Sequence, residues 1–344
     1  MKYLFSTALI FFVLFMFGCN TSPALNKESA FEIKSVSTEN PVIGVSFINI
    51  NNQRQKEFNY FKELSDIMGL PSLCLDADGS AEKQKEQIEQ MIEQKVKCII
   101  CFTYDDDLFS VIEKAKNQGI AIIRYDAACG FLPADYVISI NYEDIGRMQG
   151  QWLLENIPEG NILILSGSPA DIVAAMLHDS ALAVIGKRIN NGKYKILADK
   201  SVNNWDPSFV NEIFSEIPNI RKVNAVLAPN DGIAYEVVNE LKKLGLNGKV
   251  LVSGMDGILD NCRNIVSGDQ DMTIIKDWND RVKTALTVSK MIINGNQNEI
   301  KTDGVINYNS VRIPVIYVPG VIIRKGNISE FITRKWYTKE ELGL

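Results

Sequence analysis

The stretch VNAVLAPNDGIAYEVVNELKKLGLNGKVLVSGMDG, residues 223–257, decides the fold class. Ala225–Ala228 is a short apolar run that predicts a strand, and Val250–Val252 begins a second one. Between them, apolar residues at helical spacing predict an amphipathic helix that ends at Gly245. A strand, a helix and a strand in this order indicate a parallel sheet, in which ligands bind beyond the carboxyl ends of the strands.

Polar side chains follow both of these strands. Asn230 and Asp231 come directly after the first strand, and Asp256 follows the second. A short side chain that carries an oxygen can cap the free N–H groups at the start of a helix. The same position in a parallel sheet also suits a ligand-binding side chain. This stretch by itself leaves both interpretations open.

The composition excludes several functional classes. The chain of 344 residues has a net charge of −6, so it lacks the basic field that a nucleic-acid-binding surface requires. It contains one histidine, which argues against zinc sites and histidine-dependent catalytic triads. No nucleophile, base and orienting group converge by spacing, so we expect no enzyme, no cofactor and no metal.

Six cysteines in a chain of this length are not a disulfide framework. Cys98 and Cys101 lie in one apolar run, where residues three apart point to opposite faces of a strand, so we expect buried thiols. Cys74, Cys129 and Cys262 are expected to be free thiols, and a single disulfide remains open.

An export signal precedes the folded part. Met1 and Lys2 are followed by the uncharged apolar run Tyr3–Phe17, which has the length of a signal-peptide core. The run ends at Gly18-Cys19, which resembles the cleavage site of bacterial lipoproteins. We expect residues 1–18 to be a signal peptide, Cys19 to become a lipidated N-terminus and residues 19–40 to be a flexible tether. The protein would be exported and anchored to a membrane, facing the periplasm or the cell exterior; an ordinary signal peptide or an uncleaved anchor is the alternative.

The rest of the chain contains two blocks of alternating strands and helices, which predict two doubly wound parallel-sheet lobes of the α/β class joined by a multi-strand hinge. The N-terminal lobe is expected to comprise residues 41–141 and 278–311, and the C-terminal lobe residues 142–277 and 312–344. The expected crossings between the lobes are Ile140–Glu143, Lys276–Asn279 and Arg312–Tyr317.

Several short motifs follow one another in a characteristic order. They are Ile43-Gly44 with Arg54 beyond it, Tyr125-Asp126, Gly167-Ser168-Pro169-Ala170-Asp171, Asn204-Trp205, Ala228-Pro229-Asn230-Asp231, Gly245-Leu246-Asn247-Gly248-Lys249-Val250, Ser253-Gly254-Met255-Asp256 and Met272-Thr273-Ile274-Ile275-Lys276. This set resembles the type I periplasmic sugar-binding proteins, and most of all the D-xylose-binding proteins of ABC importers. The resemblance extends over nearly the whole chain after the tether.

The resemblance implies a sugar site between two lobes that close on the ligand. Carboxylate oxygens accept hydrogen bonds from the sugar hydroxyl groups, amides both accept and donate, arginine and lysine donate, and an aromatic ring packs on the sugar. The implied ligand-binding residues are Arg54, Asp126, Trp205, Asn230, Asp256 and Lys276, with Asn49, Asp171 and His178 as further candidates. Alternatives remain: Arg54 as a solvated helix residue, Trp205 as surface packing, Asp126 and Asp256 as turn or cap residues, and Lys276 as an ion-pair partner of Asp277 or Asp280.

The sequence departs from this family at positions that bear on the ligand. The family usually has an arginine after the residue that matches Asp126, where this chain has Ala127, and an aromatic residue where it has Gln55. The helix after Gly167-Ser168-Pro169 begins with apolar residues that include Val173 and Ala175, where relatives are polar and basic. We therefore expect altered or relaxed specificity.

These observations predict a monomeric solute-binding lipoprotein that captures a xylose-like monosaccharide and delivers it to an ABC transporter permease. A ligand-sensing module for a histidine kinase or chemoreceptor is one alternative, and a binder of a non-sugar solute such as a nucleoside is another. A transcription repressor shares this fold, but an export signal occupies the place of its helix-turn-helix.

Overall fold

The computed structural model describes residues 40–50, 52–103, 106–126, 132–308 and 311–344. The predicted signal peptide, residues 19–39 of the tether with Cys19, and the positions Ala127 and Cys129 lie outside these residues. Within the described residues, none of the helices has the length and apolar character needed to span a membrane.

The first sheet has seven strands in the order β11-β12-β5-β4-β3-β1-β2. All neighbours pair in parallel except β11 and β12, which form an antiparallel hairpin. The strands are β1 (Ile43–Phe47), β2 (Ser72–Asp76), β3 (Cys98–Phe102), β4 (Ala121–Tyr125), β5 (Tyr136–Ser139), β11 (Gly304–Tyr308) and β12 (Val311–Tyr317). Because β1 and β3 are buried along their whole length, the central strands read as continuous apolar runs.

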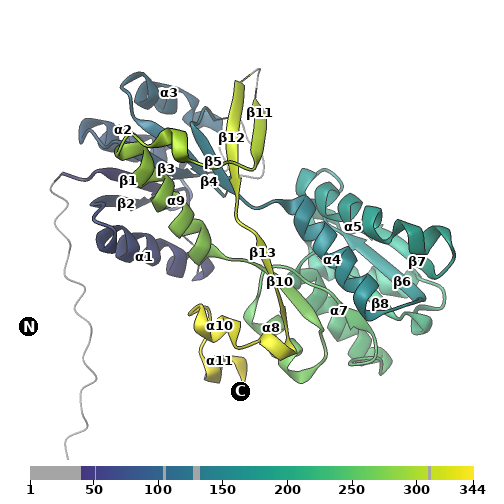
Figure 1. Ribbon diagram of the computed structural model, residues 1–344. Helices are drawn as coiled ribbons and strands as arrows, with labels where there is room; N and C mark the ends of the chain where they lie inside the picture. Colours follow the sequence, from purple (N-terminus) through teal and green to yellow (C-terminus); the bar gives the residue numbers. More distant parts are fainter. Residues whose placement is uncertain (1–39, 51, 104–105, 127–131, 309–310) are drawn as a thin grey trace, which may run out of the picture. The chain divides into compact units, whose positions relative to one another are not determined.

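Four helices connect and cover this sheet, namely α1 (Asn52–Ile67), α2 (Ala81–Glu93), α3 (Phe109–Asn117) and α9 (Trp278–Ile293). Helix α9 comes from much later in the chain and packs against α1, β3, β4 and β5. Figure 1 shows this green helix beside the purple and blue elements of the N-terminal part. The packing of α1 against α9 therefore joins residues that are more than 200 positions apart.

The second sheet contains four parallel strands in the order β7-β6-β8-β9, and an isolated parallel bridge between Met255 and Ile274 extends it to the antiparallel pair β10–β13. The strands are β6 (Gly160–Ser166), β7 (Tyr194–Ser201), β8 (Ala225–Leu227), β9 (Leu251–Val252), β10 (Met272–Lys276) and β13 (Gly320–Arg324). The accompanying helices are α4 (Tyr142–Asn156), α5 (Ile172–Asn190), α6 (Val210–Glu216), α7 (Asp231–Leu244), α8 (Leu259–Ser267), α10 (Glu330–Thr333) and α11 (Lys339–Leu342). This architecture confirms the predicted α/β fold of two doubly wound sheets.

The chain passes between the two sheets three times, after β5, after β10 and after β12 (Figure 1). The first two passages lie between β5 and α4 and between β10 and α9. The expected boundary at residue 312 was wrong, because β12 pairs with β5 and so belongs to the seven-stranded sheet. The third passage lies instead at Val318-Pro319, between β12 and β13.

Candidate functional site

Two of the predicted residues meet at the carboxyl ends of the strands of the first sheet. Arg54 lies in the first turn of α1, which follows β1, and Asp126 comes directly after β4. The Nη2 atom of Arg54 donates to Oδ2 of Asp126 at 2.6 Å. The guanidinium carbon of Arg54 also lies 3.8 Å from the centre of the Phe102 ring at the end of β3. Adjacent strands thus bring residues that are distant in the sequence to one edge of the sheet.

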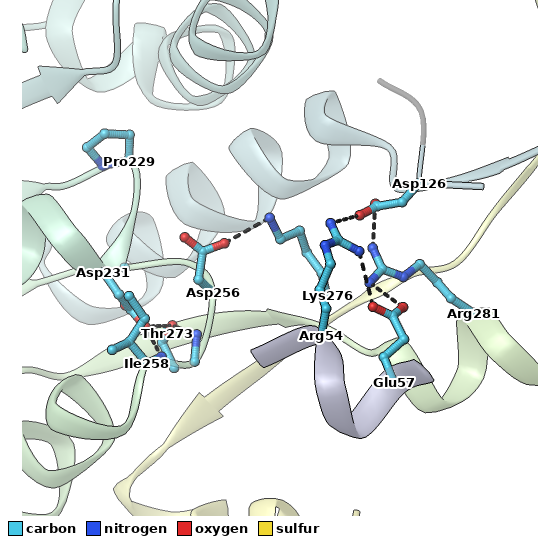
Figure 2. A network of polar contacts seen from close by, with 12 residues as sticks. Arg54, Glu57, Asp126, Pro229, Asp231, Asp256, Ile258, Thr273, Lys276 and Arg281 are labelled. Atoms are coloured by element: carbon cyan, nitrogen blue, oxygen red, sulfur yellow. Dashed lines mark hydrogen bonds and ion pairs between the residues drawn. The ribbon is translucent and has the colours of Figure 1, made fainter. Parts of the chain in front are cut away.

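Two further charged residues complete this group, and the sequence interpretation missed both. Glu57 accepts a hydrogen bond from Arg54 at 3.1 Å and one from Arg281 at 2.9 Å. Arg281, on α9, also donates to Asp126. Figure 2 shows the result, a ring in which two guanidinium groups alternate with two carboxylates. Glu57 and Arg281 are only 2 % and 5 % exposed, so this ring is set into the protein.

The sequence carries a weak signal for one of these two residues. Glu57 lies three positions after Arg54 on a helix, which puts the two side chains on one face. Arg281 has no comparable local signal, because it reaches the site only through the return of α9 to the first sheet.

The charges of this ring compensate one another. Burial alone would raise the pKa of Asp126, but Arg281, Arg54 and Lys276 together hold it below its ordinary value. Burial opposes the charge on Arg281 as well, and Asp126 and Glu57 raise its pKa in spite of this. Asp126 is therefore ionised at neutral pH, and its carboxylate is an acceptor for any donor that approaches.

A second ion pair comes from the second sheet. Lys276 ends β10, Asp256 lies in the loop after β9, and Nζ of Lys276 is 2.8 Å from Oδ1 of Asp256. Burial would lower the pKa of Lys276, but Asp256, Tyr142 and Asp126 raise it, so the ammonium group stays charged. The alternative pairing of Lys276 with Asp277 or Asp280 is not observed, since Arg334 pairs with both of those carboxylates. Figure 2 shows the Lys276–Asp256 pair beside the arginine ring.

The predicted residues Trp205 and Asp171 also meet each other. Nε1 of Trp205 donates to Oδ2 of Asp171 at 2.9 Å, while Oδ1 of Asp171 caps α5 through the N–H of Val173. The indole ring lies against Gly167, where a Cβ atom would overlap the ring. Trp205 has a φ of 58°, an uncommon value for a bulky residue, so its position is set by these contacts.

Asn230 caps helix α7, which agrees with the capping interpretation of the sequence. Its Oδ1 atom accepts the N–H of Ile233 at 3.0 Å. The neighbouring Asp231 is fully buried and accepts hydrogen bonds from Thr273, Gln270 and the N–H of Ile258.

Two further candidates occupy different places. Asn49 follows β1 and is exposed. His178 lies on α5 between Asp179 and Asp199, at 2.8 and 3.0 Å, beside a cavity of about 200 Å³ that Ser166, Ser168 and Ser201 help to line. Hydrogen bonding to Asp199, and then to Asp179, raises the pKa of His178 to about 9 against the effect of burial. The described residues include no cluster of histidine, cysteine and acidic side chains suited to a metal ion.

A larger cavity of about 820 Å³ lies between α4 and the segment that joins β12 to β13. Its arginines, Arg147 and Arg324, pair with carboxylates at its rim, such as Asp144 and Glu155. No predicted ligand-binding residue lines it. We therefore place the candidate site at the arginine ring and the Lys276–Asp256 pair.

Comparison with known proteins identifies relatives over most of the chain. Residues 43–297 match the family model of the periplasmic binding protein domain. The D-xylose-binding periplasmic proteins of Escherichia coli and Haemophilus influenzae are 29 % and 28 % identical, and each alignment covers 87 % of this chain and 91 % of the relative. A carbohydrate transporter solute binding protein from Chloroflexus aurantiacus, solved in complex with D-glucose, shares the fold with a TM-score of 0.69 at 22 % identity over 88 % of this chain and 98 % of that protein. These relatives are binding proteins and not enzymes, as the sequence predicted. The extent of the family match shows that the chain belongs to the periplasmic binding protein domain family.

Proposed function

We propose that this protein is an exported solute-binding lipoprotein that captures a neutral monosaccharide and delivers it, as a monomer, to an ABC transporter permease. The observation that carries this proposal is the charge balance of the candidate site. Arg54, Arg281 and Lys276 face Glu57, Asp126 and Asp256, three positive groups against three negative ones. A site with this balance favours an uncharged ligand with many hydroxyl groups, since each hydroxyl both donates and accepts.

The names of the relatives support the same ligand class. The relatives from Escherichia coli and Haemophilus influenzae are D-xylose-binding, and the Chloroflexus protein was solved with D-glucose. The paired charges would keep their orientation while hydroxyl groups bind to them, and hydrogen bonds to charged groups contribute about 1.5–3 kcal/mol each.

The positive charge of Arg281 is relevant to the arginine that relatives carry after Asp126 and that this chain lacks. Position 127 is an alanine, yet Asp126 receives a second guanidinium from α9 in addition to Arg54. We propose that Arg281 compensates for the lost positive charge, while the site loses a donor that would grip the sugar directly. The exposed Ile172 and Ala175 at the start of α5 then favour a ligand with fewer hydroxyl groups or with an apolar substituent.

The lobes of this proposal follow the two sheets. One lobe would contain residues 41–140, 278–317 and the seven-stranded sheet, and the other residues 142–276 and 320–344. The three passages between them would form the hinge, a common arrangement for domain closure around a ligand. The N-terminal segment would tether the protein to the membrane through Cys19.

A thermal-shift screen tests the function directly. The full chain, purified in mild detergent, would be heated with D-xylose, D-ribose, L-arabinose, D-glucose, D-galactose, L-fucose and two nucleosides. A ligand that binds only the folded state raises the unfolding midpoint. At a hundredfold excess over Kd, it adds about 2.7 kcal/mol to the free energy of unfolding. A rise with a neutral sugar is expected. A rise only with a nucleoside, or no rise at all, contradicts the proposal.

A further inference from the structure

Asp231 is a buried carboxylate at the start of α7 that has 0 % exposure. Its Oδ2 atom accepts from Oγ1 of Thr273 at 2.9 Å and from the N–H of Ile258 at 2.8 Å, and Oδ1 accepts from Nε2 of Gln270 at 3.2 Å. Among the residues with described side chains, no lysine or arginine forms an ion pair with it. Burying an acidic side chain with three neutral donors and no cation costs free energy at neutral pH, whether the group stays ionised or takes up a proton, which points to a specific role for this group.

These bonds hold the loop that carries Asp256. The N–H of Asp231 donates to the carbonyl oxygen of Met255 at 2.8 Å, and its carboxylate binds the N–H of Ile258. Asp231 therefore holds the chain on both sides of Asp256. Thr273 adds a contact, because its Oγ1 accepts the N–H of Gly257 at 3.2 Å.

Asp256 needs such support because of its backbone conformation. Its φ is 115°, in a region that residues with a Cβ atom rarely adopt. A conformation of this kind persists where surrounding contacts enforce it, and it is common at ligand-binding sites. Gly254 shows how tightly the loop is packed, since a Cβ atom there would overlap the carboxylate of Asp231.

The support is itself part of a buried polar network. Nδ2 of Asn261 lies 2.8 Å from the carbonyl oxygen of Asp231 and 2.8 Å from Oε1 of Gln270. Asn261 and Gln270 are each 1 % exposed. Such a network, when its members are paired, fixes one arrangement of the chain.

We propose that Asp231 is a positioning residue for solute binding, which acts by holding Asp256 in the orientation that faces Lys276 and the bound sugar. This inference rests on the function proposed above. Asp231 itself would not contact the ligand, because it is fully buried; Figure 2 shows it beside Thr273 and Ile258, apart from Lys276.

Calorimetric titration of the full chain with D-xylose and D-glucose tests the inference. Asp231→Asn keeps the size of the side chain but replaces one acceptor oxygen by a donor, so we expect affinity to fall about tenfold or more. Asp271→Asn is the matched control, since Asp271 binds the N–H of Val252 in the same part of the fold and does not contact the loop. The sugar affinity of Asp271→Asn is expected to stay within about twofold of that of the unaltered chain.

Two further comparisons separate positioning from a general structural effect. Thr273→Ser keeps the hydroxyl group and should retain affinity, whereas Thr273→Val should lower it; this pair remains informative if Asp231→Asn fails to fold. In an Asp256→Ala background, Asp231→Asn should weaken binding no further, because the group that it positions is gone. Unchanged affinity of Asp231→Asn, or an equal loss in the Asp256→Ala background, overturns the inference while leaving the proposed function intact. If the unaltered chain binds no sugar in the screen, the proposed function fails and the inference falls with it.

Discussion

Arg281 donates a hydrogen bond to Asp126 although the two residues are 155 positions apart in the chain. The contact depends on α9, which returns to the first sheet after the chain has built most of the second. The same guanidinium binds Glu57 at 2.9 Å. One side chain thus joins the end of β4, helix α1 and helix α9, and it links the topology of the chain to the electrostatics of the candidate site.

Replacing Arg281 by alanine is expected to destabilise the fold strongly. The change leaves the buried Glu57 and Asp126 with one guanidinium instead of two, and breaking a buried ion pair from one side costs about 3–5 kcal/mol. Denaturant unfolding monitored by circular dichroism measures the loss.

Arg147→Ala is the control for this change. Arg147 also pairs with two carboxylates, but its side chain is 46 % exposed, so its removal should cost less than about 1 kcal/mol. Similar losses for the two variants would mean that the buried ring contributes no more than a surface ion pair.

Arg54→Ala is expected to reduce sugar affinity about ten- to a hundredfold, because it removes a charged donor beside Asp126. Its side chain is more exposed than that of Arg281, so the effect on binding should exceed the effect on stability. Calorimetric titration with the sugar that gives the largest thermal shift measures it.

Lys85→Ala serves as the comparison, since Lys85 pairs with Glu82 on the surface of α2. It should bind sugar as the unaltered chain does. Full affinity in Arg54→Ala would remove Arg54 from the site.

The sequence predicts the sheets better than it predicts the site. Alternating apolar runs and amphipathic helices have strong local signals, so the strands predicted at Ala225–Ala228 and from Val250 are found as β8 and β9. The strands β11 and β13 and the short helices α10 and α11 were missed, because they come late in the chain and break the alternation. Residues at strand ends, such as Asp126 and Asp256, carry a positional signal. Arg281 carries none, since only tertiary packing decides which face of α9 meets Asp126.

The unfolding free energy is expected to depend on pH through Asp231. Burial, and then the charge of Asp256, raise its pKa from 3.8 in the unfolded chain to about 8. The charge of Asp231 also raises the pKa values of Cys262 and Tyr337. Between pH 4 and pH 8 the folded state then binds one proton more than the unfolded state, so the contribution of Asp231 to stability is full below about pH 4 and declines as the pH rises towards 8.

Comparison of the unaltered chain with Asp231→Asn isolates this contribution. The difference between their unfolding free energies should change by up to about 1.4 kcal/mol per pH unit between pH 5 and pH 8, in favour of the variant at the higher pH. Urea unfolding at four pH values measures it. Parallel curves would show that Asp231 stays ionised in the folded protein.

His178 should titrate well above the usual range of histidine. Its pKa is raised to about 9, first by the hydrogen bond to Asp199 and then by that to Asp179. The chain has one histidine, so the imidazole signals in an NMR titration belong to this residue alone. Asp199→Asn should lower the pKa towards 6.5, whereas Asp144→Asn on α4 should leave it unchanged. A pKa near 6.5 in the unaltered chain would contradict the geometry of this pair of contacts.

Cys19→Ser is expected to abolish lipid attachment. Acyl chains on Cys19 would hold the protein at the membrane by burying methylene groups, at about 0.8 kcal/mol each, and stable anchoring requires more than one chain. Cells grown with a radiolabelled fatty acid should incorporate label into the unaltered protein and not into Cys19→Ser. Cys74→Ser is the matched control, because Cys74 is a free thiol in β2. Burial raises the pKa of this thiol to about 11, so little of the reactive thiolate is present at neutral pH. Label in Cys19→Ser would place the lipid at another residue. No label in the unaltered protein would mean that the N-terminal segment acts as an ordinary signal peptide or as an anchor without lipid.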